Sequence, residues 1–129
     1  DYIGIAPASG LELAELIERG LPTKNLDLLK SKGLTFTEMA KTVISPRTLK
    51  HRKARGENLS PEETERAVRV ASIIRLAESI FGDREKALLW LRYPNDRLGE
   101  RTPLGMLQTE PGGRLVESML WGIDEGVYR

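Results

Sequence analysis

Positive side chains are concentrated in one short segment of the chain, where five basic residues fall within nine positions. Cations at this density suit contacts with the phosphates of nucleic acid, because each contact releases condensed counterions. Arg47 and Thr48 stand at the start of the segment, and the early residues of a recognition helix usually supply its base-edge contacts. The segment therefore predicts a DNA contact made by Arg47, Thr48, Lys50, His51, Arg52, Lys53 and Arg55.

The overall charge of the chain leaves an alternative open. The formal net charge is only +1, from 20 basic and 19 acidic residues, so the composition as a whole gives no argument for nucleic acid. Acidic residues also follow the basic segment directly. The alternative is therefore a solvated basic helix that offsets its acidic neighbours, which are Glu57, Glu62, Glu63 and Glu65.

The residues that could perform catalysis do not form a recognisable pattern. His51 is the only histidine and cysteine is absent, so a metal site lacks further nitrogen or sulfur ligands. Nothing in the spacing of the serines and acids supports a Ser–His–acid triad. The glycines around Pro111 follow no predicted strand and lack the lysine of a phosphate-binding loop. We therefore expect a protein that is not an enzyme and needs no cofactor.

Length and composition limit the class of protein. A chain of 129 residues with 40% apolar and 30% charged residues is expected to form one globular domain, or two small ones that share a core. The absence of cysteine permits a reducing compartment. No apolar run has the length of a membrane span, and no signal peptide is visible. We therefore expect a cytoplasmic protein without membrane contact.

Two short helices with a tight joint are predicted around the basic segment. Thr35 and Glu38 have the spacing of a capping box, which starts the first helix. Ser45 can cap the second, with proline at its first position. The pair predicts a helix-turn-helix whose second helix spans residues 46–55. The spacing between its two expected buried residues, Ala40 and Leu49, is one residue shorter than usual, so the joint is non-standard.

Further helices are predicted on both sides of this pair. Upstream, helical patterns span residues 11–19 and 22–33. Downstream, the strongest start signal of the chain opens a long helix over residues 60–81. The apolar residues of this helix form two adjacent stripes. So broad a face suggests burial on more than one side, and we expect a homodimer that pairs DNA half-sites.

The last third of the chain predicts three short helical segments. Asp83 can cap the first, which breaks at Tyr93 because a residue before proline leaves helical geometry. A single turn covers residues 102–107, and a final helix stops near Gly126. No alternating pattern predicts a strand. The predicted fold is all-α, with a helix-turn-helix-like bundle in residues 1–59 and a connecting helix and compact helical domain in residues 60–129.

Trp121 lies off the apolar stripe of the final helix, on the side of Glu117 and Arg114. A large aromatic side chain off the core face is often an interface anchor. It could instead pack on the turn at residues 102–107, and both interpretations stay open.

The order of these parts resembles the Xre/MbcA/ParS-like antitoxins, whose C-terminal domain binds and silences RES-domain toxins. The resemblance covers roughly residues 33–128, and the combination of fragments is specific although each alone is weak. The fragments are Arg47-Thr48-Leu49, His51-Arg52, Leu59-Ser60, Glu62-Glu63, Phe81-Gly82-Asp83, Trp90-Leu91, Tyr93-Pro94-Asn95, Leu98-Gly99, Thr102-Pro103-Leu104, Thr109-Glu110-Pro111-Gly112 and Val116-Glu117, with Leu120 and Gly126.

The resemblance implies a function and two partners. Family toxins are similar to ADP-ribosyltransferases and act on NAD, so this chain would protect the NAD pool by occluding the active site of a cognate RES-domain toxin. It would also repress its own operon by binding operator DNA, as a homodimer within a larger complex with the toxin. The alternative from another class is a stand-alone helix-turn-helix repressor whose C-terminal domain only dimerises.

The resemblance also implies a toxin-binding set near the end of the chain. In that family the C-terminal extremity of the antitoxin lies at or in the NAD pocket of the toxin. Val127 and Tyr128 would then fill an apolar part of this pocket, and Arg129 would offer charges to a toxin carboxylate and a toxin arginine. The alternative is a frayed, exposed end. The implied set is Glu117, Trp121, Asp124, Gly126, Val127, Tyr128 and Arg129.

Overall fold

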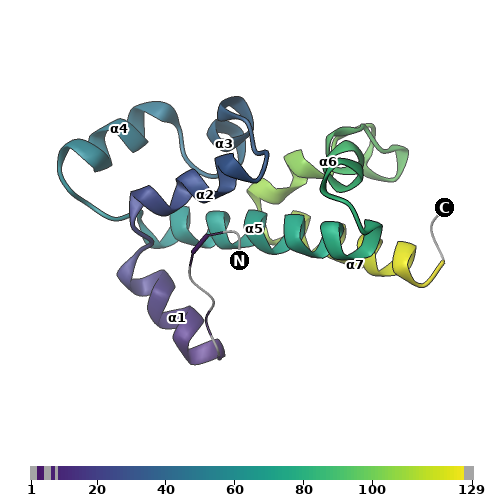
Figure 1. Cartoon of the computed structure of the whole chain (residues 1–129), viewed down its shortest axis with the longest axis horizontal. Helices are drawn as coiled ribbons and strands as arrows, with labels where there is room; N and C mark the ends of the chain where they lie inside the picture. Colours follow the sequence, from purple (N-terminus) through teal and green to yellow (C-terminus); the bar gives the residue numbers. More distant parts are fainter. Residues whose placement is uncertain (1–2, 5–6, 8, 127–129) are drawn as a thin grey trace. The chain divides into compact units, whose positions relative to one another are not determined.

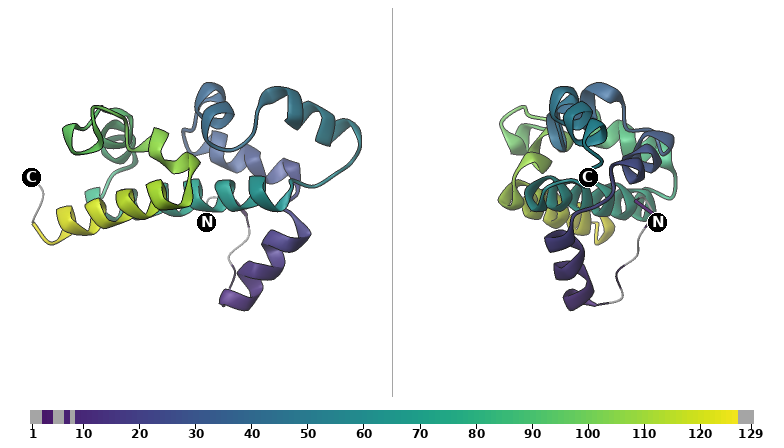
Figure 2. Two further views of the ribbon diagram at one scale, coloured as in Figure 1. Left: turned by 180° about the vertical axis from the view of Figure 1, so that it is seen from behind. Right: turned by 90° about the vertical axis from the view of Figure 1, so that its left-hand side faces the viewer.

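A computed structural model of the chain describes residues 3, 4, 7 and 9–126, and its regular elements are α-helices and 3₁₀ helices joined by turns and loops (Figures 1 and 2). The only strand-like feature of the described residues is an isolated antiparallel bridge between Asn95 and Arg101. The prediction of an all-α fold is therefore confirmed. The helices are α1 Gly10–Arg19, η1 Thr23–Asn25, α2 Leu26–Ser31, α3 Phe36–Thr42, α4 Pro46–Ala54, α5 Pro61–Phe81, α6 Arg84–Arg92, η2 Asp96–Leu98, η3 Leu104–Gln108 and α7 Glu110–Asp124.

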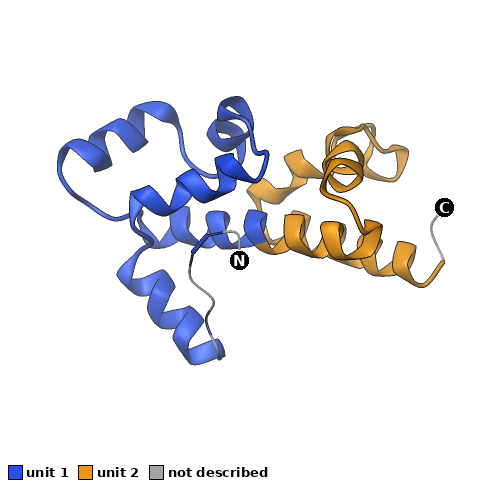
Figure 3. Cartoon of the chain, in the orientation of Figure 1, with its two compact units in different colours: residues 1–71 blue, residues 72–129 orange. Residues whose placement is uncertain are grey.

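The chain divides into two compact units, residues 1–71 (unit 1) and residues 72–129 (unit 2), as Figure 3 shows. The division falls within α5, so this 21-residue helix contributes its first half to unit 1 and its second half to unit 2. The boundary suggested by the sequence, after residue 59, assigns all of α5 to the second domain, whereas the compact units share the helix.

Local caps start the two helices of the helix-turn-helix in unit 1. The Thr35 hydroxyl accepts from the N–H of Glu38 at 3.1 Å, and the Glu38 carboxylate accepts from the N–H of Thr35 at 2.9 Å. These reciprocal bonds form the predicted capping box. The Ser45 hydroxyl likewise accepts from the N–H of Thr48 at 3.2 Å. Both predicted helix starts are therefore confirmed, and only residues 43–45 separate α3 from α4.

The core of unit 1 joins segments that are far apart in the sequence. The N–H of Leu21 donates to the buried Thr64 hydroxyl at 3.0 Å, and its carbonyl accepts from the N–H of Leu59 at 2.9 Å. The segment after α1 is thereby fixed to the start of α5. The helix expected at residues 22–33 begins as the 3₁₀ turn η1 before α2. The core side chains include Leu16, Leu21, Leu26, Leu29, Leu34, Met39, Val43, Ile44, Leu49, Leu59, Ala67 and Val70.

Unit 2 is built from the second half of α5, α6, the two short 3₁₀ helices and α7. The Asp83 carboxylate caps α6 by accepting from the N–H of Lys86 at 3.3 Å, and Thr109 caps α7. Helix α7 packs against η3. Gly112 allows this approach, since a Cβ atom there would lie 2.0 Å from the Met106 carbonyl oxygen. The core side chains include Ile73, Ile74, Ala77, Ala87, Leu88, Leu91, Leu98, Leu104, Leu107, Val116, Met119 and Leu120.

The broad apolar face of α5 is largely covered within one chain. Ala67, Val70, Ile74 and Ala77 have no exposed surface, while residues on the flanks such as Leu76 are half-buried. Burial inside the two units therefore accounts for the width that suggested a homodimer. At the end of the helix, the ring of Phe81 lies 6.0 Å from that of the half-buried Trp90, measured between centroids.

Candidate functional site

Helix α4 presents its positive charges to solvent. Ser45 fixes the start of this helix, and Leu49 is its only buried residue. Four cations of this segment are exposed, three on α4 and one, Arg55, directly after it. No described residue forms an ion pair with any of these four, whereas Arg52 is paired. These exposed residues are Arg47, Lys50, Lys53 and Arg55, with His51 among them.

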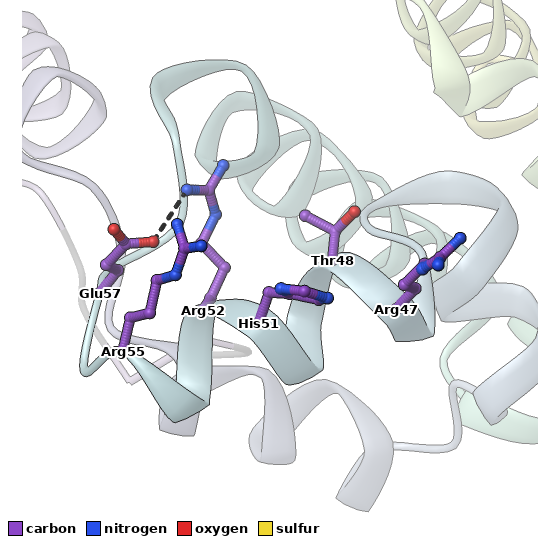
Figure 4. A pocket seen from close by; sticks show the side chains of 6 residues that line it. All are labelled: Arg47, Thr48, His51, Arg52, Arg55 and Glu57. Carbon is purple, nitrogen blue, oxygen red and sulfur yellow. Dashed lines mark hydrogen bonds and ion pairs between the residues drawn. The ribbon is translucent and has the colours of Figure 1, made fainter.

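A surface hollow of about 300 Å³ lies along α4. Its lining residues, which Figure 4 shows, come from α4 and from the loop after it. Thr48 and His51 lie between Arg47 at one end and Arg55 beside Glu57 at the other. Among the groups that line it, the guanidinium groups of Arg47 and Arg55 have no ion-pair partner in the described part of the chain, so the hollow suits an anion such as a phosphate group. The lining residues are Arg47, Thr48, His51, Arg52, Arg55 and Glu57.

Arg52 differs from the other cations of α4. Its Nε donates to Glu63 Oε1 at 3.1 Å, and its Nη2 donates to Glu63 Oε2 at 3.3 Å. Its Nη1 also donates to Glu57 Oε1 at 3.2 Å, the bond drawn in Figure 4. The guanidinium is thus committed to two acids of the same unit. For this residue the structure matches the alternative interpretation, in which basic side chains offset their acidic neighbours.

Glu63 is the more deeply buried partner, with 9% of its side chain exposed. Burial by itself would raise the pKa of the Glu63 carboxyl, but the hydrogen bond from the Ser60 N–H at 2.8 Å and those from Arg52 outweigh it and lower the pKa. The bonds to Glu63 in turn raise the pKa of the Arg52 guanidinium. Both groups are therefore charged at neutral pH.

The described part of the predicted toxin-binding set lies on or just after α7 and is exposed to solvent. Trp121 has 47% of its surface exposed. Glu117 precedes it by one helical turn, and Asp124 and Gly126 follow near the helix end; all three are exposed. Trp121 thus keeps about half of its surface accessible, and its role as an interface anchor stays a prediction. Val127, Tyr128 and Arg129 lie outside the described residues.

Two further apolar side chains are exposed on α6 and were not singled out from the sequence. Leu89 is 68% exposed, and Tyr93, one turn later at the end of the helix, is 70% exposed. The buried residues Ala87, Leu88 and Leu91 define the inner side of α6, and Leu89 lies on the opposite side. The exposure of Leu89 could therefore have been predicted from helical periodicity.

The residues that the structure describes hold neither a metal-binding cluster nor a membrane-spanning helix. None of them forms a group of three or more His, Cys, Asp or Glu side chains arranged to hold a metal ion. None of the described helices combines the length and apolar character needed to cross a bilayer.

Comparisons with known proteins decide the family. Residues 12–72 match the antitoxin Xre-like helix-turn-helix domain, and residues 76–126 match the antitoxin Xre/MbcA/ParS C-terminal toxin-binding domain. A protein named antitoxin Xre from Pseudomonas putida is 37% identical over 92% of this chain and 75% of its own length. The chain belongs to the Xre antitoxin family. Antitoxins Xre from Yersinia enterocolitica and Photorhabdus laumondii are 30% and 28% identical over 98% and 97% of the chain, covering 87% and 86% of their own lengths.

Membership of the family establishes the general function of the chain. The chain is an Xre-type antitoxin with a helix-turn-helix domain and a toxin-binding C-terminal domain. Its partners are a toxin and DNA, and it is not an enzyme, as the sequence predicted. The two matched domains meet between residues 72 and 76, close to the division between unit 1 and unit 2.

Proposed function

We propose that this Xre antitoxin neutralises a RES-domain toxin, which consumes NAD, by covering the active site of the toxin with unit 2. We further propose that it represses its own operon through α4, in the cytoplasm where DNA and NAD are both present. A homodimer would pair two operator half-sites in this arrangement. The exposed cations of α4, for which no described residue provides an ion-pair partner, carry the DNA part of the proposal.

The arrangement of α4 supports contact with DNA more than a purely solvated role. A basic helix that only offsets acids would have most of its cations paired, yet within the described part of the chain only Arg52 is. Arg47, at the second helical position, follows a capped start, where a recognition helix usually contacts bases. The toxin-binding domain matched by residues 76–126 disfavours a stand-alone repressor.

Replacing Arg47 and Lys50 together by alanine is expected to weaken operator binding by a few kcal/mol, since each of the two phosphate or base interactions removed costs about 1–3 kcal/mol. The slope of log K against log salt concentration should fall by about one for each phosphate that the variant no longer neutralises. Fluorescence anisotropy with a duplex from the promoter of the operon measures both. Toxin neutralisation should be unchanged.

A matched control replaces two exposed cations outside the matched helix-turn-helix domain, Arg75 and Lys86, by alanine. This variant loses the same formal charge and is expected to bind the operator as the wild type does. Equal weakening in both double variants would show that the whole surface charge, rather than α4, provides the affinity. Loss of neutralisation by a folded Arg47/Lys50 variant would refute the division of roles between the two units.

Trp121→Ala is expected to weaken binding of the RES-domain toxin by at least about 30-fold, because an exposed tryptophan is a frequent hot spot in interfaces. Calorimetric titration measures the affinity, and NAD consumption by the toxin at increasing antitoxin concentration measures inhibition. Tyr93→Ala, which removes another exposed aromatic side chain of unit 2, serves as the control. If only Tyr93→Ala weakens binding, the toxin contacts the end of α6 and not Trp121. If toxin that is bound by the antitoxin still consumes NAD, the antitoxin does not cover the active site.

A further inference from the structure

Helix α4 has few interactions that fix its orientation. It spans nine residues, and Leu49 is the single buried one. One apolar side chain sets the depth of a helix on its neighbours but leaves rotation about that point poorly restrained. The exposed cations of α4 keep a common orientation only if polar interactions supply the missing restraint.

Two residues on one face of α5 supply polar interactions at both ends of α4. Arg66 Nε donates to the carbonyl of Val43, in the joint before α4, at 3.0 Å. Glu63, three positions earlier on α5, binds Arg52 near the end of α4 through two parallel hydrogen bonds. Residues three apart on a helix lie on the same face. The first turns of α5 therefore hold the start and the end of the α4 segment together.

Glu63 is itself rigidly held. The N–H of Ser60 donates to Glu63 Oε1 at 2.8 Å, and the N–H of Glu63 donates to the Ser60 hydroxyl at 3.1 Å, which is a capping box at the start of α5. A planar guanidinium bound by both carboxylate oxygens has little freedom to rotate. The carboxylate is thus a fixed point from which the direction of Arg52, and of α4, is set.

We infer that Arg52 is a positioning residue, which acts with Glu63 to orient α4 for operator recognition, and does not itself bind phosphate. This inference rests on the proposed role of α4 in DNA binding. The two roles of Arg52 make opposite predictions for Glu63. If Arg52 bound phosphate, removing the Glu63 charge would leave the guanidinium paired only with the exposed Glu57, remove a negative charge near the DNA and strengthen binding. If Arg52 positions α4, the same change disorients the cations and weakens binding.

Glu63→Gln is the test, because glutamine keeps a side-chain acceptor for the capping box but loses the ion pair. Operator binding is expected to weaken about tenfold, since hydrogen bonds to charged groups are stronger than neutral ones. Binding to a random duplex should change little, so the ratio of specific to non-specific affinity falls. Anisotropy titrations with both duplexes at one salt concentration measure this ratio.

Glu65→Gln is the matched control, since it changes charge by the same amount two positions away and breaks the ion pair between the exposed Glu65 and the largely buried Arg69. A second variant, Arg52→Lys, keeps the positive charge but cannot form the two-pronged interaction with Glu63. It should also lower the specificity ratio. Thermal unfolding of each variant shows that binding is measured on folded protein.

Tighter operator binding by Glu63→Gln than by Glu65→Gln would overturn the inference and assign Arg52 to phosphate binding. Equal binding by these two variants would also overturn it, because the ion pair would then have no effect on α4. If the Arg47/Lys50 double variant binds the operator as well as the wild type, the proposed DNA contact itself fails. Weakening by the double variant without weakening by Glu63→Gln rejects only the positioning role.

Discussion

Ile74→Asp is expected to unfold unit 2 or to leave it without fixed packing. Ile74 has no exposed surface and lies in the second half of α5. An aspartate there would lose the burial of an apolar side chain, worth about 1.5–3 kcal/mol, and would place a carboxylate without a partner in the core. The total cost of several kcal/mol is comparable to the stability of a small domain, about 5–15 kcal/mol.

Circular dichroism during heating and urea titration measures this effect. Ser72→Asp is the control, since it introduces the same side chain two positions earlier on an exposed site of the same helix. Its effect should stay within about 0.5 kcal/mol. An Ile74→Asp protein that unfolds cooperatively at the wild-type midpoint would show that the core of unit 2 has been assigned to the wrong face of α5.

Gly20→Ala is expected to destabilise unit 1 by about 3–5 kcal/mol, because two separate costs combine at this position. Gly20 has a φ of 89°, in a region that residues with a Cβ rarely adopt. A Cβ atom there would also lie 2.2 Å from the carbonyl oxygen of Leu59, in the segment bonded to Leu21. The clash involves backbone, so a change of side-chain rotamer does not relieve it.

Gly56→Ala separates these two costs. Gly56 also has a positive φ, 65°, but no atom lies within 4 Å of the position that its Cβ would occupy. It should therefore cost only the conformational part, about 1–2 kcal/mol. Urea titration of both variants gives the difference. Equal destabilisation would show that the close approach of Leu59 to Gly20 does not exist in solution.

The helix starts could be predicted from the sequence because their causes are local. Thr35 and Glu38, Ser45 and Pro46, and Ser60 act on backbone groups within three residues, and each cap is present in the structure. Helical phase also placed Trp121 away from the core, and its exposure agrees with that phase. The family resemblance rested on short fragments in a specific order, and these fragments lie within or next to the two matched domains.

The role of Arg52 could not be predicted in the same way. In the sequence it is one of five similar cations, and its partner Glu63 follows eleven residues later, beyond the turn at Gly56. Which cation meets this acid depends on how α4 packs against α5, which no local pattern specifies. The sharing of α5 between the two units is likewise a property of tertiary packing, because the capping signal at Ser60 marks a helix start whether or not a domain begins there.

Because α5 runs without interruption from unit 1 into unit 2, it limits how chimeras between relatives of this antitoxin can be built. The division between the units falls inside α5. A chimera that joins unit 1 of this antitoxin to unit 2 of a relative must therefore be spliced within a helix. Each residue added to or deleted from a helix changes its phase by about 100° and its length by about 1.5 Å. A splice that keeps the register of α5 keeps Ala67 and Val70 in the core of unit 1 and Ile74 and Ala77 in the core of unit 2.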